Sequence, residues 1–551
     1  MIFNFMLCFI FLSGALAEAS VWAEDYVFSG ESRPNPLNVS ELQIDDYIKK
    51  GLIHTQKYPV ITTGVLLPER PLRESIEGAS SNIFKSIFIN IFKSTFRIES
   101  FNDLFYWLGL LDYPMDESKI PYPESSRPDY LLGYSRINIE GTDLFTMSCA
   151  TCHSGQLFGN PVLGMSKRFP RANEFFIKGV TASKYYESTV FKKFTGATED
   201  ELFYLERSLK NLNAVGLKMP QVIGLDTSLA QVALSLNKRE SDEWATQSDH
   251  FEHSPRPDVL DHEPGDSKPA VWWNLKYKTR WLSDGSVVSG NPVVTNILWN
   301  EIGRGSDLKE LQNWIETNDQ KIKELTTAIF SINAPRIENY FKASSIDENK
   351  ALAGEKLFNN ACSKCHGTYT KNWSVKDYDD APWAERIKNY KVDYPKPTKV
   401  VDVGTDPYRY TSMKSLEKLN RLKISKDYGV VIKSQKGYVP PPLVGVWARW
   451  PYLHNNSIPN LCALMTPPDE RPKTFLMGEA IDKNKDFDFE CNGYPLDFNA
   501  PLSWVKNEVY QTEKKGLSNS GHYKKIFTDK KGNEKFTQDE KTSLIQFMQT
   551  L

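Results

Sequence analysis

Two short motifs combine residue types that can attach and ligate a haem. Each reads Cys-x-x-Cys-His, and their residues are Cys149, Cys152 and His153 in the first motif and Cys362, Cys365 and His366 in the second motif. Two thiols at this spacing add to the two haem vinyl groups, and the histidine that follows ligates the iron. The sequence therefore predicts two covalently bound c-type haems, each with its iron held by the histidine of its motif.

A pair of nearby cysteines can also bind zinc or carry out thiol–disulfide exchange. A zinc ribbon needs its second cysteine pair about 15–20 residues after the first, whereas here the second pair begins only at Cys362. A redox dithiol gives no reason for a histidine directly after the second cysteine in both motifs. The spacing and the repeated histidine therefore favour haem.

The first residues of the chain are typical of a secretory signal peptide. Residues 2–12 are almost wholly apolar and lead into a run of small residues, which predicts cleavage after Ala17. The segment carries no Lys or Arg, and a buried N-terminal helix is the less favoured alternative. No later apolar stretch is long enough to span a bilayer, so we expect a periplasmic or secreted protein without a transmembrane anchor.

Two cysteines remain once the motifs are assigned and Cys8 has left with the signal peptide. They are Cys462 and Cys491. In an oxidising compartment they can form a disulfide worth about 2–4 kcal/mol. Two separate buried thiols are the alternative.

The overall composition is that of a soluble globular protein. The 551 residues include 67 basic and 69 acidic side chains, for a formal net charge of −2, and 40% are hydrophobic. This balance lacks the basic footprint of a nucleic-acid-binding protein. The histidines at 250, 253 and 262 lie in an acidic stretch that favours a surface loop over a metal site.

Helical patterns flank the second motif. Residues 348–358 read as a helix running into the cysteines, and Thr537 with Glu540 forms a capping box before a helix with an apolar face. A leading helix, an attachment site and a closing helix are the parts of a small cytochrome c domain. We expect a mainly α fold with two cytochrome c-like haem domains, long loops and an N-terminal extension. The predicted divisions are 1–17 for the signal peptide, 18–140 for the extension, 141–334 for the first haem domain with a connecting helix, and 335–551 for the second haem domain.

Three further segments complete the expected organisation. Residues 308–332 predict the connecting helix, and 83–97 predict an amphipathic helix that packs on the core rather than on a membrane. Residues 368–397 show no clear period and are interpreted as a long loop near the second haem.

Several segments around the motifs resemble one family, the di-haem c-type enzymes that include bacterial cytochrome c peroxidases and, more closely, rubber oxygenases. The matching segments are 148–155, 269–276, 403–407, 442–448, 451–459, 471–475 and 516–522. The resemblance implies a mostly helical fold in which one haem reacts and the other relays electrons. Because such families hold peroxidases and oxygenases on one scaffold, it does not fix the reaction.

The resemblance also bears on the second ligand of each iron. It implies that His522, just before the closing helix, ligates the second iron, with His454 as the runner-up. His454 can instead hydrogen-bond a haem propionate or fix its loop. Met465 and Met477 are further candidates as thioether ligands, although a buried methionine is more often core.

For the first iron no equally placed second ligand is found, which favours it as the reacting centre. Trp272 and Trp273 match an aromatic pair of the family, and Trp281 follows eight residues after the second of them. We expect these tryptophans to wall a pocket or to relay an electron between the haems. Simple core packing remains the alternative.

The leading hypothesis is an exported di-haem oxidoreductase that activates dioxygen or peroxide at the first haem. Its substrate is then an apolar, alkene-containing or other small oxidisable molecule, with a redox protein as a donor in the peroxidase version. The alternative from another class is an electron-transfer cytochrome without a substrate of its own.

Overall fold

The computed structural model describes residues 37–551 apart from 79–85, 88, 91–92, 95–97, 184–186 and 227. The predicted signal peptide and most of the predicted helix at 83–97 lie outside the described residues. No helix in the described part of the chain is long and apolar enough to cross a membrane.

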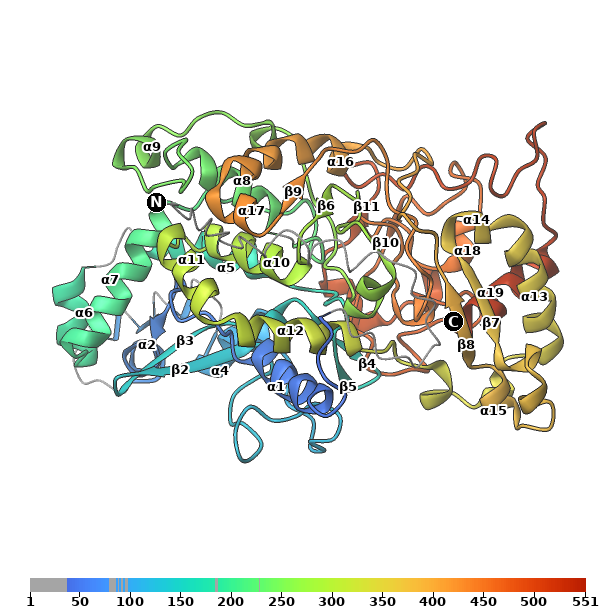
Figure 1. Ribbon diagram of the computed structural model, residues 1–551, viewed down its shortest axis with the longest axis horizontal. Helices are drawn as coiled ribbons and strands as arrows, with labels where there is room; N and C mark the ends of the chain where they lie inside the picture. Colours follow the sequence, from blue (N-terminus) through green and yellow to red (C-terminus); the bar gives the residue numbers. More distant parts are fainter. Residues whose placement is uncertain are drawn as a thin grey trace, which may run out of the picture.

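Short helices make up most of the regular structure, with about 42% of the described residues helical. The α-helices are α1 (Ile44–Gln56), α2 (Glu69–Glu77), α4 (Phe101–Trp107), α5 (Ala172–Ser183), α6 (Ser188–Thr195), α7 (Glu199–Asn213), α8 (Leu229–Asn237), α9 (Asp249–His253), α10 (Pro292–Ile302), α11 (Leu308–Thr317), α12 (Asp319–Ser331), α13 (Glu348–Ala361), α14 (Ser363–His366), α15 (Trp383–Arg386), α16 (Tyr408–Ser412), α17 (Lys423–Asp427), α18 (Leu461–Leu464) and α19 (Gln538–Gln549). Long irregular segments connect them (Figure 1).

Short antiparallel strands accompany the helices. The strands are β1 (Leu67–Pro68), β2 (Tyr134–Ile139), β3 (Thr142–Met147), β4 (Ser154–Leu157), β5 (Asn160–Leu163), β6 (Val287–Ser289), β7 (Thr368–Lys371), β8 (Asn389–Asp393), β9 (Val431–Ile432), β10 (Thr474–Phe475) and β11 (Tyr510–Gln511). One sheet has the order β1-β3-β2, and the other pairs are β4-β5, β6-β9, β7-β8 and β10-β11.

The three-stranded sheet delivers the chain to the first motif. β2 and β3 form a hairpin in which Tyr134 pairs with Met147, and β1 adds to the other edge of β3 through Leu67 and Phe145. This hairpin spans residue 140, where the sequence predicts the end of the N-terminal extension. The predicted division into domains stays a prediction, but the described extension contributes two strands, β1 and β2, to the sheet that precedes the first motif.

Helix α1 packs against α12, far away in the sequence (Figure 1). The contact is close because a Cβ atom at Gly51 would lie 2.0 Å from the carbonyl oxygen of Glu324. The sequence predicts one helix over 308–332, and this prediction is wrong in the middle of the segment, where the helix is interrupted. Asn318 leaves helical geometry with φ −122° and ψ 32°, and its side-chain amide donates to the Trp314 carbonyl at 2.9 Å, so α11 ends and α12 begins there.

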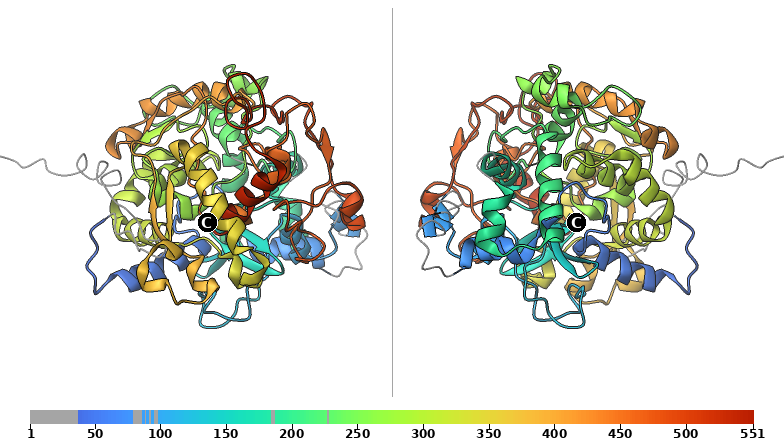
Figure 2. Two further views of the ribbon diagram at one scale, coloured as in Figure 1. Left: turned by 90° about the vertical axis from the view of Figure 1, so that its right-hand side faces the viewer. Right: turned by 90° about the vertical axis from the view of Figure 1, so that its left-hand side faces the viewer.

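Helices α13 and α19 form the corresponding pair around the second motif, and they cross beside the C-terminus (Figure 2, left). Gly354 makes the crossing possible, since a Cβ there would lie 2.0 Å from the Ser543 carbonyl oxygen. The helices predicted before the second motif and at the end of the chain are confirmed, including the capping box of Thr537 and Glu540.

The loop predicted at 368–397 is wrong, because this segment holds the β7–β8 hairpin with α15 between its strands. Tyr369 pairs with Val392, and both side chains are buried. The strands are only four and five residues long, so the alternation of buried and exposed residues is too short to stand out in the sequence.

Candidate haem-binding sites

The second motif opens into a cavity of about 290 Å³. Cys362 ends α13 and the short helix α14 carries Cys365 and His366, so all three side chains line this cavity. The Nδ1 atom of His366 lies 2.8 Å from the Pro441 carbonyl oxygen. A ring held in this way presents Nε2 to a metal, as metal-ligating histidines in proteins do.

His522 lies across the same cavity from His366. The two ring centroids are 6.1 Å apart, and a metal–imidazole bond of about 2 Å places two rings on opposite faces of one iron at roughly this separation. Burial and the neighbouring His366 lower the pKa of His522 to about 3, so the ring is neutral, as a ligand must be. The spacing and the donor set fit a haem iron.

The backbone around His522 explains how the ring is held. Its N–H donates to the Val403 carbonyl at 2.9 Å, and its φ of +50° is uncommon for a residue with a side chain. The preceding Gly521 has φ +78°, and a Cβ there would lie 2.3 Å from the carbonyl carbon of Gly404. Gly521, directly before His522, is therefore required by the close contact between two loops.

His454 lines the cavity in a different way. Its ring stacks on Tyr438, with centroids 4.0 Å apart and planes inclined by 18°, and its Nε2 is buried without a protein partner in the described structure. Burial, with Arg409 and Lys268 nearby, holds its pKa well below the usual range. Met465 also lines the cavity, whereas Met477 is buried elsewhere in the core.

The first motif follows β3 on a 3-10 turn, Cys149–Thr151, and His153 stands just before β4. The Nδ1 atom of His153 lies 2.8 Å from the Ala270 carbonyl oxygen, the same arrangement as in the second motif. Burial lowers the pKa of His153 to about 4. Sequence reasoning missed both carbonyl partners, because a backbone acceptor leaves no residue-type signal.

Three of the four motif thiols are buried in surroundings that disfavour the thiolate. Burial raises the pKa of Cys149 to about 11 and that of Cys152 and Cys362 to about 12. Thiol–disulfide exchange and zinc binding both use the thiolate, which a lowered pKa favours. Among the described residues no group of three or more His, Cys, Asp or Glu side chains is arranged to hold a metal ion, the exposed His250, His253 and His262 included.

The three predicted tryptophans are buried but separated. The ring of Trp272 lies 5.1 Å from that of His153, while the indole N–H of Trp273 donates to the Val444 carbonyl at 3.0 Å on the side of the second motif. Trp281 packs in the core with its N–H donating to Gly290 at 3.2 Å. Trp272, rather than Trp273, is the tryptophan in contact with the first motif.

A hydrogen-bonded connection runs between the two motifs. Ala270, which accepts from His153, is four residues from Asn274, and the Asn274 amide donates to the Pro442 carbonyl at 3.1 Å. The neighbouring carbonyl, that of Pro441, is the partner of His366. The segments that hold the two histidines are therefore bonded to each other.

A buried polar cluster next to the first motif was also missed. Arg304 donates to the Met147 carbonyl at 2.7 Å and lies 4.1 Å over the ring of Tyr58, whose hydroxyl donates to Glu301 at 2.8 Å. These residues come from three distant segments, so no sequence motif joins them. The cluster fastens the N-terminal segment to the end of β3.

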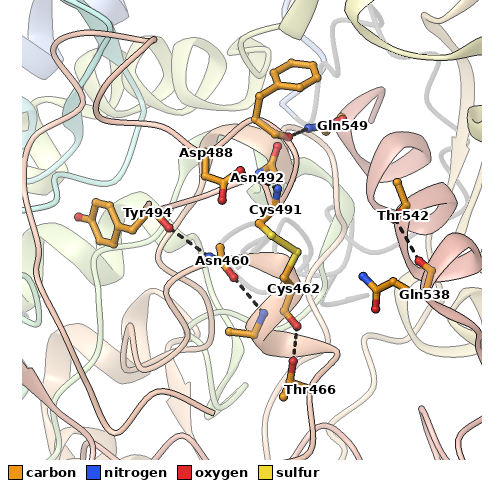
Figure 3. Close-up of a disulfide and its surroundings, with 12 residues drawn as sticks. Asn460, Cys462, Thr466, Asp488, Cys491, Asn492, Tyr494, Gln538, Thr542 and Gln549 are labelled. Atoms are coloured by element: carbon orange, nitrogen blue, oxygen red, sulfur yellow. Dashed lines mark hydrogen bonds between the residues drawn. A yellow bond between two sulfur atoms is a disulfide. The ribbon is translucent and has the colours of Figure 1, made fainter. Parts of the chain in front are cut away.

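A disulfide joins Cys462 to Cys491, with Cα atoms 5.0 Å apart (Figure 3). Asn460 caps α18 by accepting from the Ala463 N–H at 2.9 Å and donates to the Tyr494 carbonyl at 3.1 Å. Leu461 and Leu464 of α18 line the cavity of the second motif. The disulfide thus fixes one wall of that cavity.

Part of this wall falls in a segment with known relatives. Residues 437–476 match the model of a family described as RoxA-like, cytochrome c-like. This match supports a cytochrome c of the RoxA family. It implies covalently bound c-type haem, in agreement with the residues that line the cavity.

Two curated relatives are both from Sinorhizobium fredii. The uncharacterized protein y4iJ is 36% identical over 124 residues, which cover 22% of this chain and 19% of the relative. The uncharacterized protein y4iM is 41% identical over 101 residues, which cover 17% of this chain and 22% of the relative. The matched part spans about a fifth of the length of each relative.

Proposed function

We propose that this protein is an exported di-haem c-type oxidoreductase that activates dioxygen or peroxide at the first haem, while the second haem relays electrons. The observation that carries the proposal is the difference between the two histidines of the motifs. His366 faces His522, whereas none of the other histidines of the sequence, all of which lie in the described residues, has a ring contact with His153.

The remaining histidines have other surroundings. His54 lies 2.7 Å from Glu324, His454 stacks on Tyr438, and those at 250, 253 and 262 are exposed. An iron with histidine on both faces passes electrons, while an iron with an open face binds dioxygen or peroxide. This distribution supports the first motif as the reacting centre.

A haem supplies redox chemistry at its iron, and the residues of this chain set how it does so. The Ala270 and Pro441 carbonyls fix the orientation of His153 and His366 and favour the tautomer with a free Nε2. The buried tryptophan next to His153 excludes water from that side of the motif. The bonded segments between the motifs offer a route for electrons.

The proposed substrate is an apolar molecule with a carbon–carbon double bond, or another small oxidisable molecule, and the proposed location is the periplasm or the extracellular space. Support comes from the resemblance to rubber oxygenases and from the RoxA-like match at 437–476. A redox protein as electron donor belongs to the peroxidase version of the proposal.

The deciding experiment measures carbon monoxide binding to the dithionite-reduced protein, followed by turnover. We expect one of two haems to bind carbon monoxide, and we expect an oligomeric alkene supplied with ¹⁸O₂ to yield labelled carbonyl products, detected by mass spectrometry. Cys149→Ala/Cys152→Ala is the control that should abolish both. The proposal is overturned if neither reduced haem binds carbon monoxide.

An electron-transfer cytochrome without its own substrate is the second candidate. The bonded connection through Asn274 and Pro442 favours it, since such a route serves electron transfer whether or not a substrate is oxidised. In that case neither reduced haem binds carbon monoxide, and the protein reduces and oxidises a partner without forming labelled products.

A further inference from the structure

The lining of the second motif's cavity carries an excess of positive charge. Five of its lining residues are cationic and, among the described residues that line it, none is Asp or Glu. The five are Lys167, Arg168, Lys268, Lys278 and Arg449. Burial of a cation away from water costs free energy unless an anion or several hydrogen bonds compensate it.

The side chains are close enough to affect one another. Burial lowers the pKa of Lys278 to about 8, and Arg449 adds to the effect. Burial, followed by Arg449 and Arg168, holds the pKa of Lys268 well below its usual range. The Nζ atom of Lys268 donates to the Arg449 carbonyl at 3.4 Å, and Arg168 donates to the carbonyls of Ala448 and Trp450 at 3.3 Å each. Arg168, Lys268 and Arg449 therefore meet at one segment, beside the cavity that His366 also lines.

Backbone carbonyls engage some of these cations. Lys268 donates to the Pro451 carbonyl at 2.5 Å, Arg449 donates to Pro442 at 3.0 Å, and Arg168 donates to Gln156 at 2.7 Å. Within the described part of the chain, no ion pair reaches any of the five, and neither a hydrogen bond nor an ion pair reaches the Nζ atom of Lys278, which is 8% exposed. Glu479 is the acidic group near Lys167 and Arg168, and it does not line the cavity. The lining itself has donors but no carboxylate.

Both halves of the site contribute. Lys268 stands two residues before Ala270, the partner of His153, and the Lys167 N–H donates to the Cys152 carbonyl at 3.1 Å. Arg449 lies on the stretch that follows Pro441 and Pro442. The positive group therefore lies where the segments supporting the two motifs meet.

We propose that Arg168, Lys268, Lys278 and Arg449 form a carboxylate-binding site. This site binds the propionates of the haem attached at the second motif. The inference rests on the haem attachment in the proposed function, and it is independent of the proposed substrate. Carboxylates supply the negative charge that the lining lacks, and Arg and Lys are the side chains that bind them.

The chain offers a matched control for Lys278. Lys276 lies inside the 3-10 helix Trp272–Tyr277, and Lys278 is the residue that caps its C-terminal end. Lys276 is 4% exposed, and burial lowers its pKa to about 8, as it does for Lys278. Its Nζ atom donates to Asn333 at 2.7 Å, and it does not line the cavity. The two lysines differ mainly in which groups they face.

The experiment compares Lys278→Met with Lys276→Met in the full protein with its haem attached, by spectroelectrochemical titration. We expect Lys278→Met to lower the midpoint potential of the second haem, because losing a nearby cation favours the ferric form, and to shift the propionate vibrations. Lys276→Met should leave both unchanged. Equal effects of the two variants, or none, would overturn the proposal.

A second measurement separates haem propionates from a free anion. If the cations hold propionates, the midpoint potentials of the unaltered protein do not change when inorganic phosphate is added. A saturable dependence on phosphate contradicts the proposal and assigns the cations to an exchangeable anion. This measurement also decides the matter if Lys278→Met fails to fold.

Turnover is scored separately from the potentials. If the protein forms no labelled product but Lys278→Met lowers the midpoint potential, the proposed substrate chemistry is refuted and the carboxylate site stands. A protein that turns over normally without the shift refutes only the carboxylate site.

Discussion

The first motif lies between two β-strands and the second at the end of a helix, yet each holds its histidine by the same bond. In both, Nδ1 lies 2.8 Å from a backbone carbonyl oxygen, that of Ala270 in one and Pro441 in the other. Across from the ring the surroundings differ. His366 faces His522 at 6.1 Å, while His153 has the ring of Trp272 at 5.1 Å.

This comparison separates what a pentapeptide determines from what the fold determines. The pentapeptide places two thiols and one histidine together, on a 3-10 turn between strands in the first motif and at a helix end in the second. What lies across from the motif histidine depends on residues distant in sequence, such as His522. Two motifs of one pattern therefore have different surroundings within one chain, as the proposed division of roles requires.

The strongest test of the comparison removes one haem at a time. Cys149→Ala/Cys152→Ala and Cys362→Ala/Cys365→Ala should each lose one of two haems, because a thioether bond survives denaturation only where the cysteines are present. Mass spectrometry and haem staining of a denaturing gel measure the loss. We expect carbon monoxide binding to disappear in the first variant and to persist in the second, and the reverse outcome would exchange the roles of the two sites.

The next test converts the second site into a copy of the first. His522→Ala should open the second iron, change its spin state and let it bind carbon monoxide, as seen in absorption and electron spin resonance spectra. His454→Ala is the control that should leave the low-spin signal, because its ring stacks on Tyr438. If His454→Ala opens the iron instead, the ligand assignment passes to His454.

A smaller effect is expected at the tryptophans. Trp272→Phe should perturb the spectrum of the first haem, since its ring contacts that of His153, while the second haem stays unchanged. Trp273→Phe should cost about 1 kcal/mol through the lost bond to Val444, and Trp273→Ala about 3–5 kcal/mol through the cavity. Absorption spectra and thermal unfolding distinguish the two positions. If Trp273→Phe lowers turnover, Trp273 takes part in the reaction after all.

The smallest expected effect concerns the helix pairs beside the motifs. Gly51→Ala and Gly354→Ala should each destabilise by about 1–3 kcal/mol, because the added Cβ meets a backbone carbonyl oxygen 2.0 Å away. Gly179→Ala in α5 is the control, with nothing within 4 Å of the added Cβ, and it should stabilise by about 0.5–1 kcal/mol. Thermal unfolding measures all three, and equal melting temperatures would show that the helices move apart easily.

The attachment motifs and the helices that flank the second motif could be predicted from the sequence, because these depend on local patterns. The capping box of Thr537 and Glu540 is one such pattern, and the apolar face that follows it is another. The break at Asn318 and the hairpin at β7 and β8 were not predicted. A break within a continuous helical pattern and strands of four or five residues give only weak periodic signals.

The surroundings of the motifs were beyond sequence reasoning for a different reason. The partners of the two histidines are backbone carbonyls, which any residue type provides. The cations of the second cavity come from widely separated segments, with Arg168 and Arg449 on opposite sides of the second motif in the sequence. The one available signal was the presence of Arg449 between Trp447 and Trp450, a charge within a strongly apolar stretch.

The packing of α1 on α12 has a consequence for how the chain folds. α1 ends at Gln56 and its partner begins only at Asp319, so this contact closes a very long loop of chain. Contacts at such sequence separation form late and slow the search for the native state. α1 also contacts the turn that carries the first motif. The helix that borders the first motif is therefore fully packed only when α12, from beyond the middle of the chain, has reached it.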